Sequence, residues 1–488
     1  MTVLHVVTMS RVTQSSKTTQ LDVVPRPSLI TRVPPEIIRE IFKFVVFSSE
    51  EARSHEVKTL CLVDKDWNDI ANTTSDLWTK ITLAYPLHAN QFSAARKWLK
   101  ASEPKVVDVD INLCDPTWSG PEEENWLPSA ESLQGAIEVL RGSEHRWESI
   151  SIKSDAWIPI QELLRAWVVT PCLPALESIV ITRTTLKVVE VPFLPLTPQR
   201  LIEWPALFGG NQTLMPKLLE VALCAVPVVW TSAAATSFQN LRVLSIREDI
   251  SEAGPTFEQF SAALSVMSPR LETLSIGAYY QIPDDPHTQT QVPFVRLPAL
   301  KHLIFGWTDA DLACCFLEIF QIPETLETLW LAEERTLAAG AESLSPVFDL
   351  LFHLGSEGYQ NKDPSRPWIS MRGLKIVGVT CMHSDPCEEI AFLQNAPMIE
   401  EILLEDVSDA LIEATAILAE TRLLQSLKCV KIIWNWSDEC KLEKARLIIE
   451  RFQGLGLRAM ARLGDKEGRD IFLVQDSEDE ELDEEDGE

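Results

Sequence analysis

The chain has 488 residues, of which 45% are hydrophobic and 24% charged, a composition typical of folded rather than disordered proteins. At about 150 residues per domain, this length predicts roughly three domains, unless internal repeats build one solenoid. The balance of 43 basic against 72 acidic residues gives a net charge of −29. This charge excludes nucleic acid and membrane surfaces as expected partners, because both require clustered Lys and Arg.

Residues 1–28 are rich in Ser and Thr and lack hydrophobic periodicity, which predicts a disordered N-terminal tail. They hold no apolar run of signal-peptide length, and the sequence has no stretch of 18 apolar residues, so we expect no membrane span. The ten cysteines form no regular short-spaced set, which indicates reduced thiols. We therefore expect an intracellular protein, in the cytoplasm, the nucleus or both.

Residues 29–83 show the pattern of a small helical unit. Pro34 and Pro35 are expected to open its first helix. Two apolar stripes follow, made of Ile37, Ile38, Ile41, Phe42 and Val45, and of Val57, Leu60, Leu62, Val63, Trp67 and Ile70. A unit of this size is marginal alone, so we expect it to gain a core from a partner or from the adjoining domain.

Several separated elements of this unit resemble an F-box: Val33-Pro34-Pro35-Glu36-Ile37, Ile41-Phe42, Leu62-Val63 with Trp67, and Leu77-Trp78. F-box proteins dock onto the Skp-type adaptor of a cullin–RING ubiquitin ligase, and their remaining domain holds the protein to be ubiquitinated. The resemblance implies that the adaptor-binding residues are Pro34, Pro35, Glu36, Ile37, Leu62 and Val63. The alternative is that these apolar residues only hold the helices together.

A second pattern recurs along the chain: an apolar residue, two positions skipped, another apolar residue, one skipped, and a third. Its twelve copies begin at Trp78, Val106, Trp147, Leu176, Leu218, Leu241, Leu271, Leu300, Leu326, Leu374, Ile399 and Leu427. Most lie 23–30 residues apart, which predicts a structural repeat, and gaps of 41, 42 and 48 residues indicate insertions.

Between these copies, apolar residues at a spacing of three to four predict helices, for example at 257–267 and 312–320. Alternation of strand and helix at this period resembles leucine-rich repeats, whose neighbouring units stack to bury a shared core. We therefore expect an α/β fold with an F-box at 29–83 and a leucine-rich-repeat-like βα solenoid at 84–475. Residues 476–488 hold ten acidic residues in thirteen, which predicts a disordered acidic tail.

The repeat also predicts a binding surface, because alternate residues of a strand point to opposite faces. The residue between the second and third apolar positions should face outward, and this row includes Ile304, Trp330 and Leu403. Near them lie His302, Trp307, Tyr279 and Tyr280, the last two in the 277–296 insertion. Such a cluster is typical of a site for a target protein. Two alternatives are that an insertion covers Trp330, or that a shift of one residue turns the row inward.

Catalytic motifs are weak in this sequence. There is no Gly-Lys phosphate loop, no Gly-x-Ser-x-Gly and no His-Glu-x-x-His. Asp108 and Asp110 fit an alternating strand, and Cys381, His383 and Cys387 match no established zinc spacing. We expect no metal, no cofactor and no enzymatic activity.

The favoured function is therefore the substrate-recognition subunit of an SCF-type cullin–RING ubiquitin ligase. Its expected partners are a Skp-type adaptor, the cullin ligase subunits and an unidentified target protein. One alternative is a protein-binding scaffold whose F-box-like helices only cap the solenoid. Another is an enzyme with a site built by the insertions at 114–128, 186–212 and 355–370.

Overall fold

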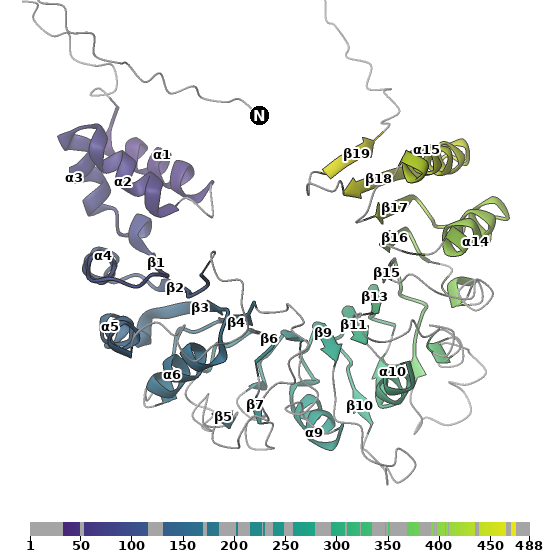
Figure 1. Cartoon of the computed structure of the whole chain (residues 1–488), viewed down its shortest axis with the longest axis horizontal. Helices are drawn as coiled ribbons and strands as arrows, with labels where there is room; N and C mark the ends of the chain where they lie inside the picture. The colour runs from purple at the N-terminus through teal and green to yellow at the C-terminus, as the bar shows by residue number, and fades with distance from the viewer. Residues whose placement is uncertain are drawn as a thin grey trace, which may run out of the picture. The chain divides into compact units, whose positions relative to one another are not determined.

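The structure is a computed structural model of the whole chain, shown in Figure 1. It describes residues 33–48, 53–115, 130–168, 173–184, 202–203, 215–226, 228–229, 238–247, 257–278, 294–307, 310–322, 324–333, 347, 350–351, 368–380, 392–394, 396, 398–405, 407, 409–434, 439–464 and 470–474. Both expected tails, 1–28 and 476–488, lie outside these residues.

The chain divides into two compact units between Thr74 and Ser75. This division falls earlier than the expected boundary after residue 83. The reason is that residues 80–83 belong to strand β1 (Lys80–Ala84), which is hydrogen-bonded along its length to β2 (Val107–Asn112) in the second unit.

The first unit consists of three helices, α1 (Pro35–Phe47), α2 (Arg53–Val63) and α3 (Lys65–Thr73). Pro35 opens α1, where its missing N–H leaves no bond unmade. Asp64 caps α3 by accepting a hydrogen bond from the Trp67 backbone N–H at 2.7 Å. The buried stripe of α1 is Ile38, Phe42 and Val46.

The buried residues of α1 differ from the apolar stripe that the sequence predicts. Ile37, Ile41 and Val45 are exposed, although the periodicity had grouped them with the core. The first helix carries apolar residues on two faces, and sequence periodicity alone does not show which face is covered.

The second unit is built on one sheet, in which 14 strands lie among the described residues. In spatial order they are β1, β2, β3 (Trp147–Ser154), β4 (Ser178–Arg183), β6 (Glu220–Cys224), β8 (Val243–Arg247), β9 (Thr273–Ala278), β11 (His302–Trp307), β13 (Thr328–Glu333), β15 (Ile376–Thr380), β16 (Glu401–Glu405), β17 (Cys429–Trp434), β18 (Arg458–Gly464) and β19 (Asp470–Val474). All pair in parallel except β19, which pairs antiparallel with β18. The fold is thus mixed α/β around a large parallel sheet.

Each of the twelve predicted copies of the repeat supplies one strand, from β1 to β17, and its second and third apolar residues are buried. Strand β18 is a thirteenth parallel strand that the pattern missed. Its inward residues are Ala459 and Ala461, both buried, and alanine did not count as a large apolar position.

The described helices of the second unit lie along the outer side of the row of strands (Figure 1). They are α4 (Ala89–Ala101), α5 (Ala130–Leu140), α6 (Trp157–Val168), α9 (Phe257–Met267), α10 (Ala310–Leu317), α14 (Asp409–Glu420) and α15 (Glu439–Gly454), with short 3-10 turns at Ser75–Trp78 (η2) and Glu144–Arg146 (η4). Two small parallel sheets complete the described strands, β10 (Val295–Arg296), β12 (Phe320–Ile322) and β14 (Trp368–Ile369), and β5 (Ile202–Glu203) with β7 (Val228–Val229). No helix in the described part of the chain is both long and apolar enough to cross a bilayer.

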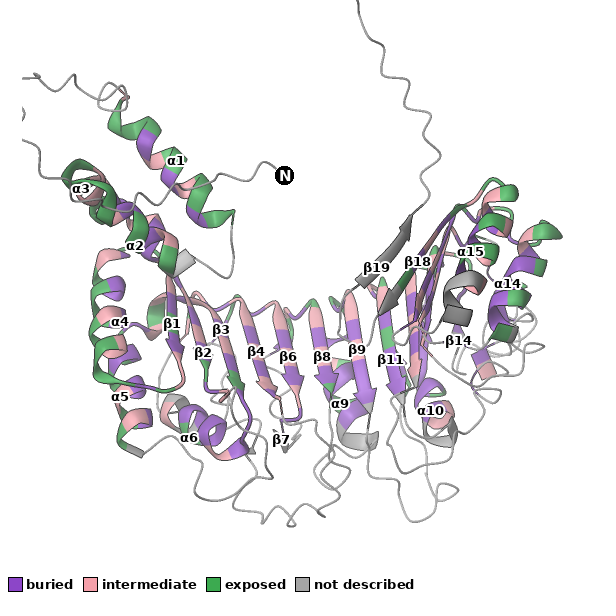
Figure 2. Cartoon of the chain, turned by 45° about the horizontal axis from the view of Figure 1, so that its top comes forward, coloured by how far each residue is buried: buried purple, intermediate pink, exposed green. Residues whose placement is uncertain are grey.

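The core lies between the large sheet and these helices. Phe316 of α10 stacks on Phe305 of β11, with ring centroids 5.5 Å apart, and also contacts Phe260 of α9. Along most strands, buried positions alternate with half-buried ones, as in β4, β6 and β16, and Figure 2 colours the ribbon by this burial. The opposite face of the sheet carries no helix among the described residues of this unit.

At the end of the sheet where the parallel strands begin, a row of residues with alternating charges runs from strand to strand. The residue just before each of seven successive strands, β8 to β17, is in turn Arg242, Glu272, Lys301, Glu327, Lys375, Glu400 and Lys428. Ion pairs join Lys301 to Glu272 at 2.8 Å and Lys428 to Glu400 at 2.7 Å. We call these seven residues the charge ladder. Because the strands are in register, each residue has oppositely charged neighbours.

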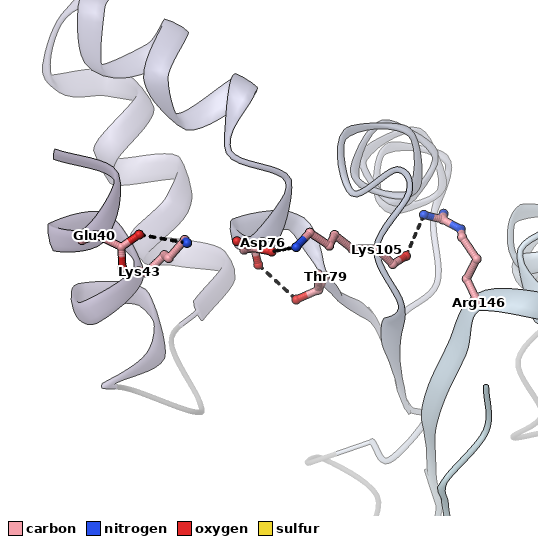
Figure 3. Close-up of polar contacts among 6 residues, drawn as sticks. All are labelled: Glu40, Lys43, Asp76, Thr79, Lys105 and Arg146. Atoms are coloured by element: carbon pink, nitrogen blue, oxygen red, sulfur yellow. Dashed lines mark hydrogen bonds and ion pairs between the residues drawn. The ribbon is translucent and has the colours of Figure 1, made fainter. Parts of the chain in front are cut away.

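The start of the second unit is fixed by polar contacts (Figure 3). Lys105 Nζ lies 2.8 Å from Asp76 Oδ1, and the Thr79 hydroxyl donates to the Asp76 carbonyl at 3.1 Å. Arg146 donates to the Lys105 carbonyl oxygen at 3.1 Å. These contacts join the first turn of the unit to the segments that flank β2 and β3.

Candidate functional site

The first candidate surface lies on the helical unit. Its residues are those of the expected adaptor-binding set, Pro34, Pro35, Glu36, Ile37, Leu62 and Val63, which we call the motif surface. All six are exposed, four around the start of α1 and two at the end of α2. Leu62 is 85% exposed and Ile37 52%. Since large apolar side chains on a small unit are costly to leave in water, this surface has the character of an interface.

The exposed apolar surface of α1 extends beyond the motif surface. Ile41 and Phe44 lie four and seven residues after Ile37, so the three share one side of the helix. Phe44 is 77% exposed. Sequence reasoning had not singled out Phe44, and the signal that was available is the continuous apolar run at residues 44–47. Figure 2 shows this exposed side of α1 beside its buried one.

The second candidate surface is the face of the large sheet on which no described helix lies. Ile304 of β11 pairs with Trp330 of β13, Trp330 with Gly378 of β15, and Gly378 with Leu403 of β16. Ile304 is exposed, and Trp330 and Leu403 are half-buried. The residues on either side of each in sequence are mostly buried, so the register is the expected one and not the shifted alternative. We call these four residues the open-face strip.

Trp330 is held in a defined orientation on this face. Its indole packs over Gly378, where an added β-carbon would lie 2.7 Å from the ring atoms Cδ2 and Cε3. The indole Nε1–H donates to the Thr380 hydroxyl at 3.2 Å, and that hydroxyl donates to Glu405 Oε2 at 3.3 Å. The polar edge of the indole is therefore bonded within the protein and one ring face packs on Gly378, while the side chain as a whole stays half-buried.

Other charged and polar groups surround the strip. His302 Nδ1 lies 3.1 Å from the Thr328 hydroxyl. Glu401 and Glu405 flank Leu403 on the same strand and the same face, and Lys431 pairs with Glu401 at 2.6 Å. The sequence analysis did not include Thr380 and Glu405, because outside the central row it assigned only His302 to the outward side of the strands.

For three residues predicted to belong to this surface, the structure describes no side chain. Tyr279 and Tyr280 lie outside the described residues. Trp307 ends β11, but its side chain lies outside the described part as well. The alternative that the 277–296 insertion covers Trp330 concerns residues that mostly lie outside the described part.

The other end of the same face is acidic. Burial raises the pKa of Glu148, and the nearby charges of Asp108 and Glu177 raise it further. The Ser149 hydroxyl donates to Asp108 Oδ1 at 2.6 Å, and the Ser178 hydroxyl donates to Glu220 Oε2 at 3.0 Å. These hydroxyl bonds hold the carboxylates on the strands, as expected for Asp108 on an alternating strand.

Among the described residues, no group of three or more His, Cys, Asp or Glu side chains is placed to hold a metal ion. Cys381, His383 and Cys387 lie outside those residues, as does most of the 114–128, 186–212 and 355–370 insertions. The chemistry that the described surfaces offer is apolar and aromatic contact, with carboxylates at the margin.

Comparisons with known proteins assign no family to the chain. A search against protein-family models found no match to the chain, and a search of curated proteins found none either.

Proposed function

We propose that this chain is a non-catalytic substrate-recognition subunit of an SCF-type cullin–RING ubiquitin ligase. The helical unit, as an F-box, binds a Skp-type adaptor through the motif surface. The second unit, as a leucine-rich-repeat-like solenoid, holds the target protein. Other subunits of the ligase carry out ubiquitin transfer.

The observation that carries the proposal is the exposure of the whole motif surface. If Ile37, Leu62 and Val63 only held the helices together, they would be buried within the unit. Instead, Ile38, Phe42 and Val46 of α1, with Val57 and Leu60 of α2, form the internal core. The residues that resemble the F-box contact positions are therefore left over for a partner.

A second observation supports the role of the sheet. A large parallel sheet normally has both faces covered, because its strands are apolar on both sides. Here the outward residues of the first strands are mainly small or polar, such as Thr82 and Ser151, and an apolar, aromatic strip follows at β11 to β16. This change of character along one face supports a localised protein-binding site.

The test is co-purification of the full chain with a Skp-type adaptor. The wild type is compared with the triple variant Pro34→Ala/Ile37→Asp/Leu62→Asp. We expect a stoichiometric complex with the wild type and none with the triple variant, because two charges would enter an apolar interface. Circular dichroism must show that the variant remains folded.

The matched control is Leu447→Asp on α15, a leucine that is also largely exposed but lies in the second unit. It should leave the complex intact. If the wild type binds no adaptor, the ubiquitin-ligase proposal fails. The alternative of a protein-binding scaffold, whose helical unit serves as a cap, would then be the better account.

A further inference from the structure

We propose that the open-face strip binds a basic side chain, arginine or lysine, presented by the target protein, with the indole of Trp330 as its platform. This inference rests on the proposed function, because it specifies the chemistry of the target that the second unit would hold. It does not depend on the adaptor.

The first step is the electronic character of the exposed ring. An indole has a positive edge and a negative face. The N–H at the edge of Trp330 is already bonded to Thr380. Since the other face packs on Gly378, we take the solvent-accessible part of this half-buried side chain to be the electron-rich outer face, which attracts a cation placed over it by about 0.5–2 kcal/mol, depending on exposure.

The second step is the position of negative charge beside the ring. Thr380 connects the indole N–H to the Glu405 carboxylate, so Glu405 lies two hydrogen bonds away from Trp330. Glu405 has a further contact within the protein besides Thr380, and a carboxylate, with about four acceptor sites, can keep both while it accepts another N–H. A guanidinium stacked on the indole would have a carboxylate within reach, which is the arrangement that arginine uses best.

The third step is the breadth of the strip. Ile304 and Leu403 continue the row on either side, over strands spaced about 4.8 Å apart. They can take the aliphatic stem of a long basic side chain or a neighbouring apolar residue. The net charge of −29 also favours encounter with a basic partner. An acidic or phosphorylated ligand would be repelled by Glu405.

The experiment uses the purified full chain and a phage-displayed library of random dodecapeptides. Peptides selected on the wild type should be enriched in Arg and Lys over the input library, and Trp330→Ala should abolish that enrichment. The strongest peptide is then resynthesised with citrulline in place of arginine, which keeps the shape but removes the charge. We expect its dissociation constant to rise at least about tenfold, equivalent to about 1.4 kcal/mol.

Two further variants keep the test decisive if Trp330→Ala folds poorly. Trp330→Leu keeps an apolar side chain but removes the ring, and Glu405→Gln removes one charge at nearly constant shape. Both should weaken the arginine peptide several-fold. Val180→Ala, in the same outward row on β4 but outside the strip, should leave binding unchanged.

Selection without basic enrichment, equal enrichment on Trp330→Ala, or no selected peptide at all would overturn the inference. The same variants test the proposed function separately from this inference. The triple variant of the motif surface should lose the adaptor and keep the peptide, whereas Trp330→Leu should keep the adaptor and lose the peptide.

Discussion

The indole of Trp330 on β13 occupies the space that a β-carbon on Gly378 of β15 would need. The two residues are direct partners in register between adjacent parallel strands. An aromatic side chain that covers a cross-strand glycine protects the bare backbone there and gains a flat surface to pack on. The glycine therefore allows the indole ring to lie close to the backbone of the sheet.

Gly378→Ala should lift the indole and break its bond to Thr380. Because the added carbon meets a ring and not a flexible chain end, we expect a loss of about 1–3 kcal/mol in unfolding free energy. Denaturant unfolding of the variant measures it. Gly454→Ala is the control, since a β-carbon at this last residue of α15 would meet nothing within 4 Å. Equal effects of the two substitutions would contradict the packing of Trp330 on Gly378.

Within the helical unit, exposed and buried apolar residues should differ sharply. Leu62→Asp should change local stability by less than about 0.5 kcal/mol, because the side chain is mostly in water. Phe42→Ala should cost about 3–5 kcal/mol, because Phe42 is fully buried and its ring lies 4.9 Å from that of Trp67. Hydrogen exchange of the α1 amides reports this unit separately from the large sheet. Similar protection in both variants would show that the core of the unit is assigned wrongly.

Glu148→Gln should stabilise the protein at neutral pH. Burial, together with Asp108 and Glu177, raises the pKa of Glu148, so ionisation of this carboxylate is less favourable in the folded chain than in the unfolded one. Folding stability therefore falls as the pH rises from the ordinary glutamate range through the raised pKa. The melting temperature of Glu148→Gln should exceed that of the wild type at pH 7, and the difference should vanish in acid. Glu318→Gln, at an exposed position after α10, should show no such pattern.

The charge ladder should show the opposite pH dependence. Hydrogen bonds and ion pairs from Lys301 and Lys428 lower the pKa values of Glu272 and Glu400. Their contribution is present above the ordinary glutamate range and is lost as the pH falls through the lowered pKa values. Glu272→Gln/Glu400→Gln should therefore lower the melting temperature slightly at neutral pH and low salt. High salt or acid should remove the difference, because exposed pairs are weak and screened. If the difference in melting temperature persisted in acid, it would come from packing and not from the ion pairs.

Much of the fold could be predicted from the sequence because its signal is repeated. A strand that packs one face on a helical layer must alternate, and twelve copies of that alternation located twelve of the parallel strands. Strand β18 escaped because Ala459 and Ala461 fill their inward positions with small side chains. The short sheet formed by β10, β12 and β14 escaped as well, since Ile319 and Phe320 were read as the end of a helix, whereas Phe320 begins β12.

The candidate sites were predictable to different degrees. The outward positions of Ile304, Trp330 and Leu403 follow from strand periodicity. The packing of Trp330 on Gly378 does not, because it joins residues 48 positions apart across two strands. The apolar run at residues 44–47 indicates that Phe44 belongs to an apolar surface, but not that it is exposed, since α1 has apolar residues on two sides and only the packing of α2 and α3 decides which side is covered.

The charge ladder imposes an odd–even rule on the length of the second unit. Its residues alternate in sign from Arg242 to Lys428, one per strand. Deleting or duplicating one internal repeat would set like charges on adjacent strands, whereas deleting or duplicating two successive repeats would preserve the alternation. Repeats in this part of the chain are therefore exchangeable in pairs, and an engineered shortening should remove two.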